Sequence, residues 1–275
     1  MIAPADYEFL RGLLLRRSGI ALSGEKQYLV ESRLAPVARR HALDGIADVV
    51  ARLRRGDVPV LEEAVVAAMT TNESYFFRDK APFEAFVQVM LPAIDATRPA
   101  GQPIRVWCAA ASTGQEPYSL AMALKEHPRA AGGRRVEILA TDLSGDVIER
   151  ARAGVYSQFE VQRGLPIQHL VKYFSKQDDS WRVSPEIRSM VEFRKLNLMH
   201  PFVGLGRFDI VFCRNVLIYF GLETKADVLT RIARTLAADG FLVLGAAETV
   251  VGISEAFRPV SDRRGLYAVH LPALA

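Results

Sequence analysis

The 275-residue chain has little cysteine and no long apolar run. Its two cysteines, Cys108 and Cys213, are too few for a disulfide framework or a zinc site, and we expect both to be buried reduced thiols. No segment approaches the roughly 18 apolar residues that span a bilayer, and the sequence does not open with a basic region followed by a hydrophobic stretch. We therefore expect a cytoplasmic protein without direct membrane insertion.

Motifs of several enzyme classes are also missing. The five histidines are scattered, and no Ser/His/Asp or Cys/His constellation is present, so the sequence predicts neither a metal site nor nucleophilic catalysis. No Gly-Lys-Ser/Thr follows a glycine-rich loop, which disfavours nucleoside triphosphate binding. The Gly-x-Gly-x-x-Gly of a nicotinamide dehydrogenase is absent from the start of the first helix of the α/β region.

The chain does have a local excess of arginine. Its net charge of +4 and isoelectric point near 9.1 are only mildly basic, but the first 60 residues carry Arg16, Arg17, Arg33, Arg39, Arg40, Arg52, Arg54 and Arg55. A solvated helical surface and a docking surface for an acidic partner both remain open. Few aromatic residues lie among these arginines, so nucleic-acid binding is not expected.

The first 70 residues or so show helical patterns. Apolar residues recur at helical spacing in 9–14, 30–37 and 46–53, and 61–69 consists of good helix formers. We expect Gly56 to end the third helix. Pro36 requires the second helix to begin late or to kink. The sequence thus predicts a small helical bundle.

From about residue 104, short apolar runs alternate with helical patterns. The predicted strands are 104–109, 136–141, 191–196, 208–213, 241–245 and 266–269. The predicted helices are 118–126, 146–153 and 228–237. This alternation implies a mainly parallel sheet with helices on both faces. The stretch 156–190 breaks the rhythm with short β-like pieces at 172–174 and 181–183, and we predict an inserted subdomain there.

A loop of small residues, 109–117, joins the first predicted strand to its helix. Small residues let the backbone come close to a ligand at the carboxyl edge of a sheet. The next strand ends at Asp142, where a carboxylate can accept hydrogen bonds from both ribose hydroxyls of an adenosine. A helix N-cap at Asp142 or Ser144 is the alternative. Together the two features favour a nucleoside site, without separating NAD from S-adenosylmethionine.

Several longer motifs resemble those of the chemotaxis receptor glutamate methyltransferases, the CheR family. They are Thr70-Thr71-Asn72-Glu73-Ser74-Tyr75-Phe76-Phe77-Arg78, the loop 107–118, Ala140-Thr141-Asp142-Leu143-Ser144, Asn197-Leu198 and the segment 208–220. The helices of 6–53 are similar to the family's N-terminal domain. The chain departs from the family pattern at Gln115, where glutamate is usual, at Ser74, where threonine is common, and at Ala246, where a late motif usually has histidine. None of these departures puts activity in doubt.

The resemblance implies an α/β fold. It implies a doubly wound, Rossmann-like methyltransferase sheet with a small N-terminal all-helical domain and an inserted antiparallel β-subdomain. The corresponding domains are a helical domain at 1–70, a linker and first helix at 71–103, and a methyltransferase domain at 104–275 with its insertion at about 156–192.

The resemblance also implies roles for individual residues. Residues expected to contact S-adenosylmethionine are Asn72, Ser74, Arg78, Glu116, Asp142, Asn197, Leu198, Arg214 and Asn215. Arg78 and Tyr219 are expected to act in catalysis by orienting the acceptor carboxylate and lining the methyl channel. The residue patterns alone would also allow an N-cap at Asn72, an ordinary turn at Arg214 and Asn215, and a core aromatic at Tyr219.

The implied function is methyl transfer from S-adenosylmethionine to glutamate side chains of methyl-accepting chemotaxis receptors, which forms methyl esters. The implied partner is the acidic helical methylation region of a receptor, approached by a monomer recruited to membrane receptor arrays. Two alternatives stay open: a catalytically silent S-adenosylmethionine-binding signalling module, and a methyltransferase that acts on another protein or on RNA.

Overall fold

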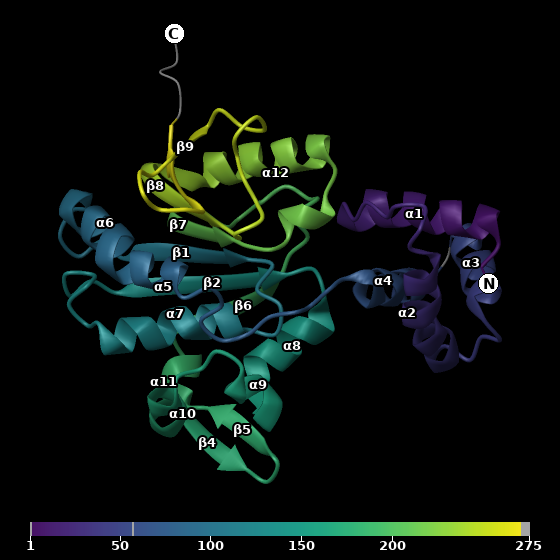
Figure 1. Cartoon of the computed structure of the whole chain (residues 1–275), viewed down its shortest axis with the longest axis horizontal. Helices are drawn as coiled ribbons and strands as arrows, with labels where there is room; N and C mark the ends of the chain where they lie inside the picture. Colours follow the sequence, from purple (N-terminus) through teal and green to yellow (C-terminus); the bar gives the residue numbers. More distant parts are fainter. Residues whose placement is uncertain (1, 57, 271–275) are drawn as a thin grey trace. The chain divides into compact units, whose positions relative to one another are not determined.

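The computed structural model describes residues 2–56 and 58–270 (Figure 1). The chain divides into two compact units. One comprises Met1–Thr71 with Tyr219–Thr224, and the other comprises Asn72–Ile218 with Lys225–Ala275. Within the described ranges, every helix is too short or too polar to span a bilayer.

The first unit is helical, as its sequence pattern predicts. It contains α1 (Pro4–Ser18), α2 (Gln27–Arg40), α3 (Ile46–Arg55) and α4 (Pro59–Met69). Proline at the first position of α1 and α4 suits a helix start, because that N–H has no partner inside the helix. The expected stop at Gly56 is confirmed: it follows α3 with a φ of 83°, which glycine adopts without steric cost.

The core of this unit comes from the predicted helical faces. Leu10, Leu14, Leu34 and Val49 are fully buried. Of the two outcomes expected for Pro36, a late start or a kink, the late start was wrong, because α2 runs from Gln27 through this proline to Arg40. Pro36 lies on the exposed side of α2, where water can satisfy the carbonyl that loses its helical partner.

The second unit opens with a helical stretch and continues as an α/β fold. The helical stretch consists of α5 (Ala81–Ala85), a π-helical turn η1 (Phe86–Met90) and α6 (Leu91–Thr97). The parallel part of the main sheet contains β1 (Ile104–Ala109), β2 (Val136–Asp142), β6 (Val191–Lys195), β7 (Phe208–Cys213) and β8 (Leu236–Leu244). The remaining strands are β9 (Phe257–Pro259) and β10 (Leu266–Val269).

The strand order of the main sheet is β6-β2-β1-β7-β8-β10-β9. β10 runs antiparallel to both of its neighbours, and the pairs from β6 to β8 are parallel. The order reverses at β1, from which the chain passes first to β2 on one side and later to β7 on the other. In such sheets ligands bind beyond the carboxyl ends of the strands at this switch point.

Helices cover both faces of the sheet, as expected for a doubly wound fold. The elements α7 (Gln115–Glu126) and α8 (Gly145–Ala153) pack on one face with α5 and α6, in a core that includes Val106, Cys108 and Phe212. On the other face lies α12 (Leu222–Thr235), which buries Val228, Leu229 and Ile232. Successive strand residues such as Val106 and Trp107 are both buried, because each strand is covered on both sides.

The predicted insertion is a small antiparallel sheet with short helices. Its strands are β3 (Val155–Ser157), β4 (Phe174–Gln177) and β5 (Ser180–Val183), in the order β3-β5-β4. Its helices are α9 (Gln158–Gln162), α10 (Ile167–Tyr173) and α11 (Pro185–Arg188). The β-like piece predicted at 172–174 was mostly wrong, because Lys172 and Tyr173 end α10 and only Phe174 begins a strand. Leu170 and Tyr173 lie three residues apart on α10 and are both buried, so helical spacing decides this segment.

Candidate cofactor and catalytic site

The loop between β1 and α7 has a strained backbone. Ala110 and Ser112 have φ values of 60° and 51°, and Gly114 has a φ of 95°. A Cβ on Gly114 would lie 3.1 Å from both the Ala151 Cβ and the Tyr156 Oη. Non-glycine residues in this conformation cost energy and are enriched at ligand sites. The loop therefore brings its backbone to the carboxyl edge of the sheet at the switch point.

Asp142 ends β2 next to this loop. Its Oδ2 accepts the Ser112 N–H over 2.9 Å, and its Oδ1 accepts the Ser144 N–H over 3.1 Å. Burial raises the pKa of Asp142, and these backbone hydrogen bonds oppose the rise. The helix cap of α8 is Ser144, whose hydroxyl accepts the Val147 N–H, so Asp142 is not the N-cap. A carboxylate has about four acceptor sites, so Asp142 can still accept a ribose hydroxyl beside its backbone hydrogen bonds.

The Asn197 loop lies beside Asp142. The Leu196 N–H donates to the Asp142 carbonyl over 2.8 Å, which joins the ends of β6 and β2. The Asn197 Oδ1 accepts the Met199 N–H over 2.9 Å, and Leu198 is buried. The structure thus brings Asp142, Asn197 and Leu198 together at one edge, where the predicted ribose and adenine contacts belong.

The segment 72–78 reaches the same loop from the N-terminal side of the unit. The Ser112 Oγ donates to the Asn72 carbonyl over 2.9 Å. Asn72 does not cap a helix, because residues 71–75 have no regular secondary structure and the next helix begins at Ala81. Phe77, Asp79 and Lys80 also have positive φ values, of 52°, 69° and 47°. This second strained segment begins three residues after the half-buried Ser74 and five after the exposed Asn72.

Arg78 is held at the end of that segment. Its Nη1 donates to the Glu73 carbonyl over 3.1 Å, and its guanidinium lies 5.5 Å from the centre of the Tyr75 ring. Arg163 lies over the same ring at 4.5 Å and pairs with Glu73 at 2.5 Å. Within the described part of the chain, the other guanidinium N–H groups of Arg78 make no hydrogen bond. Arg78 is therefore anchored, with donors left for a ligand.

Arg214 joins this segment to the strands. Its side chain is 2% exposed, its Nη1 donates to the Glu116 Oε2 over 2.8 Å, and its Nη2 donates to Asp79 over 2.7 Å. The same Nη2 donates to the Arg78 carbonyl over 3.0 Å. Among the described residues, the buried Arg214 Nε has no partner. Arg214 is thus mainly a clamp, with one N–H left for a ligand.

Glu116 completes this cluster. It lies in the first turn of α7, and burial raises the pKa of its carboxyl while Arg214 opposes the rise. Asp79, which our sequence analysis missed, is the second carboxylate partner of Arg214. Its position directly after the Arg78 motif was the only signal. Asn215 follows Arg214 with a φ of 59°, so the turn after β7 is tight.

Tyr219 belongs to a different unit. It ends the 3-10 turn η2 (Leu217–Tyr219), and its carbonyl accepts the Ala21 N–H over 2.9 Å. The bridge between Ile20 and Phe220 lies next to it. Tyr219 belongs to the helical unit, whereas the predicted cofactor contacts belong to the other unit. Its role in catalysis therefore stays a prediction.

The fold and this site define a class of enzyme. The antiparallel β10 distinguishes the sheet from the order 3-2-1-4-5-6 of dinucleotide-binding folds. This sheet, the strained loop after β1 and Asp142 together define an S-adenosylmethionine-dependent methyltransferase. The family model described as CheR methyltransferase, SAM binding domain, matches residues 72–266, and the model described as CheR methyltransferase, all-alpha domain, matches residues 5–70. The chain belongs to the CheR methyltransferase family.

Curated relatives match over nearly the whole chain. Chemotaxis protein methyltransferase 1 of Pseudomonas aeruginosa is 44% identical over 270 residues, which cover 96% of this chain and 97% of that protein. Chemotaxis protein methyltransferase Cher2 of Pseudomonas putida is 42% identical over 265 residues, 95% of this chain and 96% of that protein. A chemotaxis protein methyltransferase of Vibrio parahaemolyticus is 39% identical over 268 residues, 96% of each.

The residues present fit S-adenosylmethionine. Asp142 is a buried carboxylate at the strand end where a ribose would lie, and Arg214 carries an unpaired buried N–H. Among residues 2–56 and 58–270, no cluster of His, Cys, Asp and Glu side chains could hold a metal ion. When bound, the cofactor supplies a methyl group on a positively charged sulfur.

Proposed function

We propose that this chain methylates glutamate side chains of chemotaxis receptors and forms glutamate methyl esters. The family and the names of the curated relatives support this activity. A glutamate side chain has a pKa of about 4.3, so it is already a carboxylate at neutral pH and needs no general base. The enzyme must hold the carboxylate in line with the methyl carbon and exclude water.

The observation that carries the proposal is the state of Arg78. Its backbone carbonyl is fixed by Arg214, and its guanidinium keeps N–H donors that bond to no described residue. A guanidinium can pair with a carboxylate through two parallel hydrogen bonds, which fixes the orientation of that carboxylate. Arg78 is therefore suited to orient an acceptor glutamate. In the proposed site Asp142, Asn197 and Leu198 hold the nucleoside, while Asn72, Ser74, Glu116, Arg214 and Asn215 surround the rest of the cofactor.

We propose the arginine-rich surface at the end of α2 as the receptor contact. Arg39 and Arg40 are exposed, and neither makes an ion pair within the described residues. Arg33 is removed from this surface, because its guanidinium donates to the carbonyls of Met69 and Thr70. Recruitment to membrane receptor arrays would follow from docking of an acidic receptor helix here.

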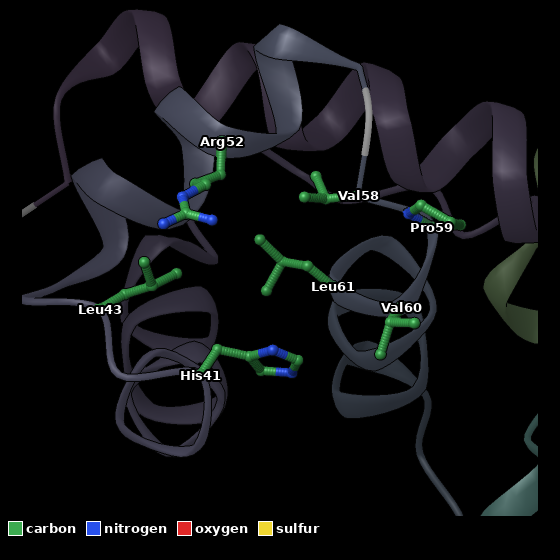
Figure 2. A pocket seen from close by; sticks show the side chains of 7 residues that line it. All are labelled: His41, Leu43, Arg52, Val58, Pro59, Val60 and Leu61. Carbon is green, nitrogen blue, oxygen red and sulfur yellow. The ribbon is translucent and has the colours of Figure 1, made fainter.

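A largely apolar hollow of the same helical unit includes His41, the residue that follows Arg40. It has a volume of about 270 Å³ and is lined by His41, Leu43, Arg52, Val58, Pro59, Val60 and Leu61 (Figure 2). Val60 is 72% exposed, and Leu61 forms the buried floor. An acidic helix with apolar residues on one face would match this combination of positive charge and apolar surface.

The proposal is tested by incubating the protein with radiolabelled S-adenosylmethionine and receptor-rich membranes. Label should enter the receptor and be released by base, because methyl esters hydrolyse in base and N-methyl groups do not. The Arg78→Ala variant serves as the matched control and should incorporate far less label. Base-stable label would point to another protein substrate, and absence of label with intact cofactor binding would support a silent binding module.

A further inference from the structure

Glu248 is a buried carboxylate that follows β8 and is 9% exposed. Its Oε2 accepts the N–H groups of Asn215 and Gly245, each over 2.7 Å. Its Oε1 accepts the N–H groups of Val216 over 3.0 Å and Ile218 over 3.2 Å. Four backbone donors therefore converge on one side chain. Among the described residues, no cationic side chain pairs with Glu248, so the four backbone amides stabilise its negative charge.

Three of the four donors, Asn215, Val216 and Ile218, come from the turn after β7 and the start of η2. That turn carries Arg214 and Asn215 and is not part of a regular element until η2 begins at Leu217. Its backbone groups cannot bond to one another as they would in a helix, and a buried N–H without a partner is costly. Glu248 satisfies three of them at once. The carboxylate thereby defines the path of the turn.

Gly245 is fitted to the same arrangement. A Cβ at this position would lie 2.6 Å from the Asn215 Nδ2 and 2.8 Å from the Glu248 Oε2. Real side chains do not tolerate such distances, so any larger residue would displace the Asn215 amide or the carboxylate. The ends of β7 and β8 are thus joined through Glu248, with the Asn215 side chain lying against Gly245.

We propose that Glu248 is a positioning residue for the cofactor: it holds the Arg214-Asn215 turn in its binding conformation. The inference rests on the proposed assignment of Arg214 and Asn215 to the cofactor. It does not depend on the receptor substrate. Glu248 acts through these two residues and need not touch the cofactor.

The test compares two isosteric variants of buried carboxylates in the same unit. Glu248→Gln replaces one acceptor oxygen by an amide that faces backbone N–H groups. Asp209→Asn does the same at the amino end of β7, where Asp209 accepts the Arg105 N–H over 2.7 Å and pairs with Arg98 at 2.6 Å. Both variants should lower the urea midpoint. Only Glu248→Gln should weaken S-adenosylhomocysteine binding in calorimetry, by roughly tenfold or more.

The kinetic signature should follow the binding. In Glu248→Gln, KM for S-adenosylmethionine should rise while kcat at saturating cofactor falls less, and Asp209→Asn should leave KM unchanged. If Glu248→Gln does not fold, Glu248→Asp keeps the negative charge but its shorter side chain withdraws the carboxylate from the four amides, and it should produce the same cofactor defect.

Two results would overturn the inference, and they are distinguishable. If Asn215→Ala weakens cofactor binding but the folded Glu248→Gln binds like wild type, Glu248 does not position the turn. If Asn215→Ala binds like wild type, the assignment of Asn215 fails and the inference fails with it. If the wild-type protein binds the cofactor but does not methylate receptors, that result would instead count against the proposed receptor function alone.

Discussion

Arg214 and Glu116, 98 residues apart, form a buried ion pair in which the Arg214 Nη1 lies 2.8 Å from the Glu116 Oε2. The pair joins the turn after β7 to the first turn of α7. Through Nη2 the same guanidinium holds the backbone of Arg78. One arginine thus connects two predicted cofactor segments with the predicted catalytic residue.

Glu116→Gln should destabilise the protein substantially. Removing one partner of a buried pair leaves an uncompensated charge and costs about 3–5 kcal/mol. Arg214 retains Asp79, so we expect the low end of that range. Urea unfolding at pH 7 measures the change. Wild-type stability in this variant would show that Asp79 alone suffices for Arg214.

Asp142→Ala should weaken S-adenosylhomocysteine binding by about 1.5–3 kcal/mol, the usual contribution of hydrogen bonds to a charged group. Asp142 also accepts the Ser112 and Ser144 N–H groups, so Asp142→Asn, which retains one acceptor oxygen, is the matched variant and should lose less. Titration calorimetry gives both affinities. Unchanged affinity in Asp142→Ala would remove Asp142 from the ribose site.

Arg78→Lys and Tyr219→Phe should reduce turnover more than they reduce S-adenosylmethionine binding, with the larger effect at Arg78. Lysine cannot reproduce the two parallel hydrogen bonds of a guanidinium. Interactions made only in the transition state lower kcat without an equal loss of binding. Single-turnover methylation of a receptor fragment at saturating cofactor measures this. Wild-type rates in both variants would make these residues structural.

Receptor methylation should fall as ionic strength rises, because exposed charges are screened within about 8–10 Å at physiological salt. Replacing Arg39 and Arg40 together by glutamine should flatten this dependence and leave cofactor affinity unchanged. Arg54→Gln is the control, since Arg54 is already paired with Asp6 at 3.0 Å. An identical salt dependence in wild type and the double variant would exclude the end of α2 as the docking surface.

Asp239 should contribute stability that depends on pH. Hydrogen bonds from Arg98, aided by Thr97, lower its pKa to about 2 against the opposing effect of burial. Its folded-state pKa lies below the unfolded value of about 3.9, so the stabilisation is present above pH 4 and is lost as the pH falls toward 2.

The corresponding variant is Asp239→Asn. Because the carboxylate is partly exposed, we expect it to be less stable than wild type by only about 0.5–1 kcal/mol at pH 7. The difference should shrink between pH 4 and pH 2 in urea unfolding. A difference that is constant over this range would show that the charge of Asp239 contributes nothing.

Much of the fold was predictable from local patterns. The predicted bounds of β1 and β7 are confirmed to the residue, because each is an apolar run of strand length that the sheet buries on both faces. The short β9 was missed, since Phe257–Pro259 is too short to show alternation. α10 was missed because its last residues, Lys172 and Tyr173, run directly into β4 at Phe174 and together resemble a short strand.

For the candidate site too, some features could be predicted from the sequence and others depended on the tertiary structure. The sequence by itself determined the class of loop after β1, the acid at the end of β2 and the family motifs, because each lies within a short stretch whose residue types are diagnostic. Only the tertiary structure decided that Arg214 is clamped between Glu116 and Asp79, that Arg33 supports the end of α4, and that Glu248 organises the turn after β7. These pairings join residues from about 30 to more than 130 positions apart. Such partners are set by strand order and burial, which bring distant backbone and side-chain groups together only once the sheet has formed.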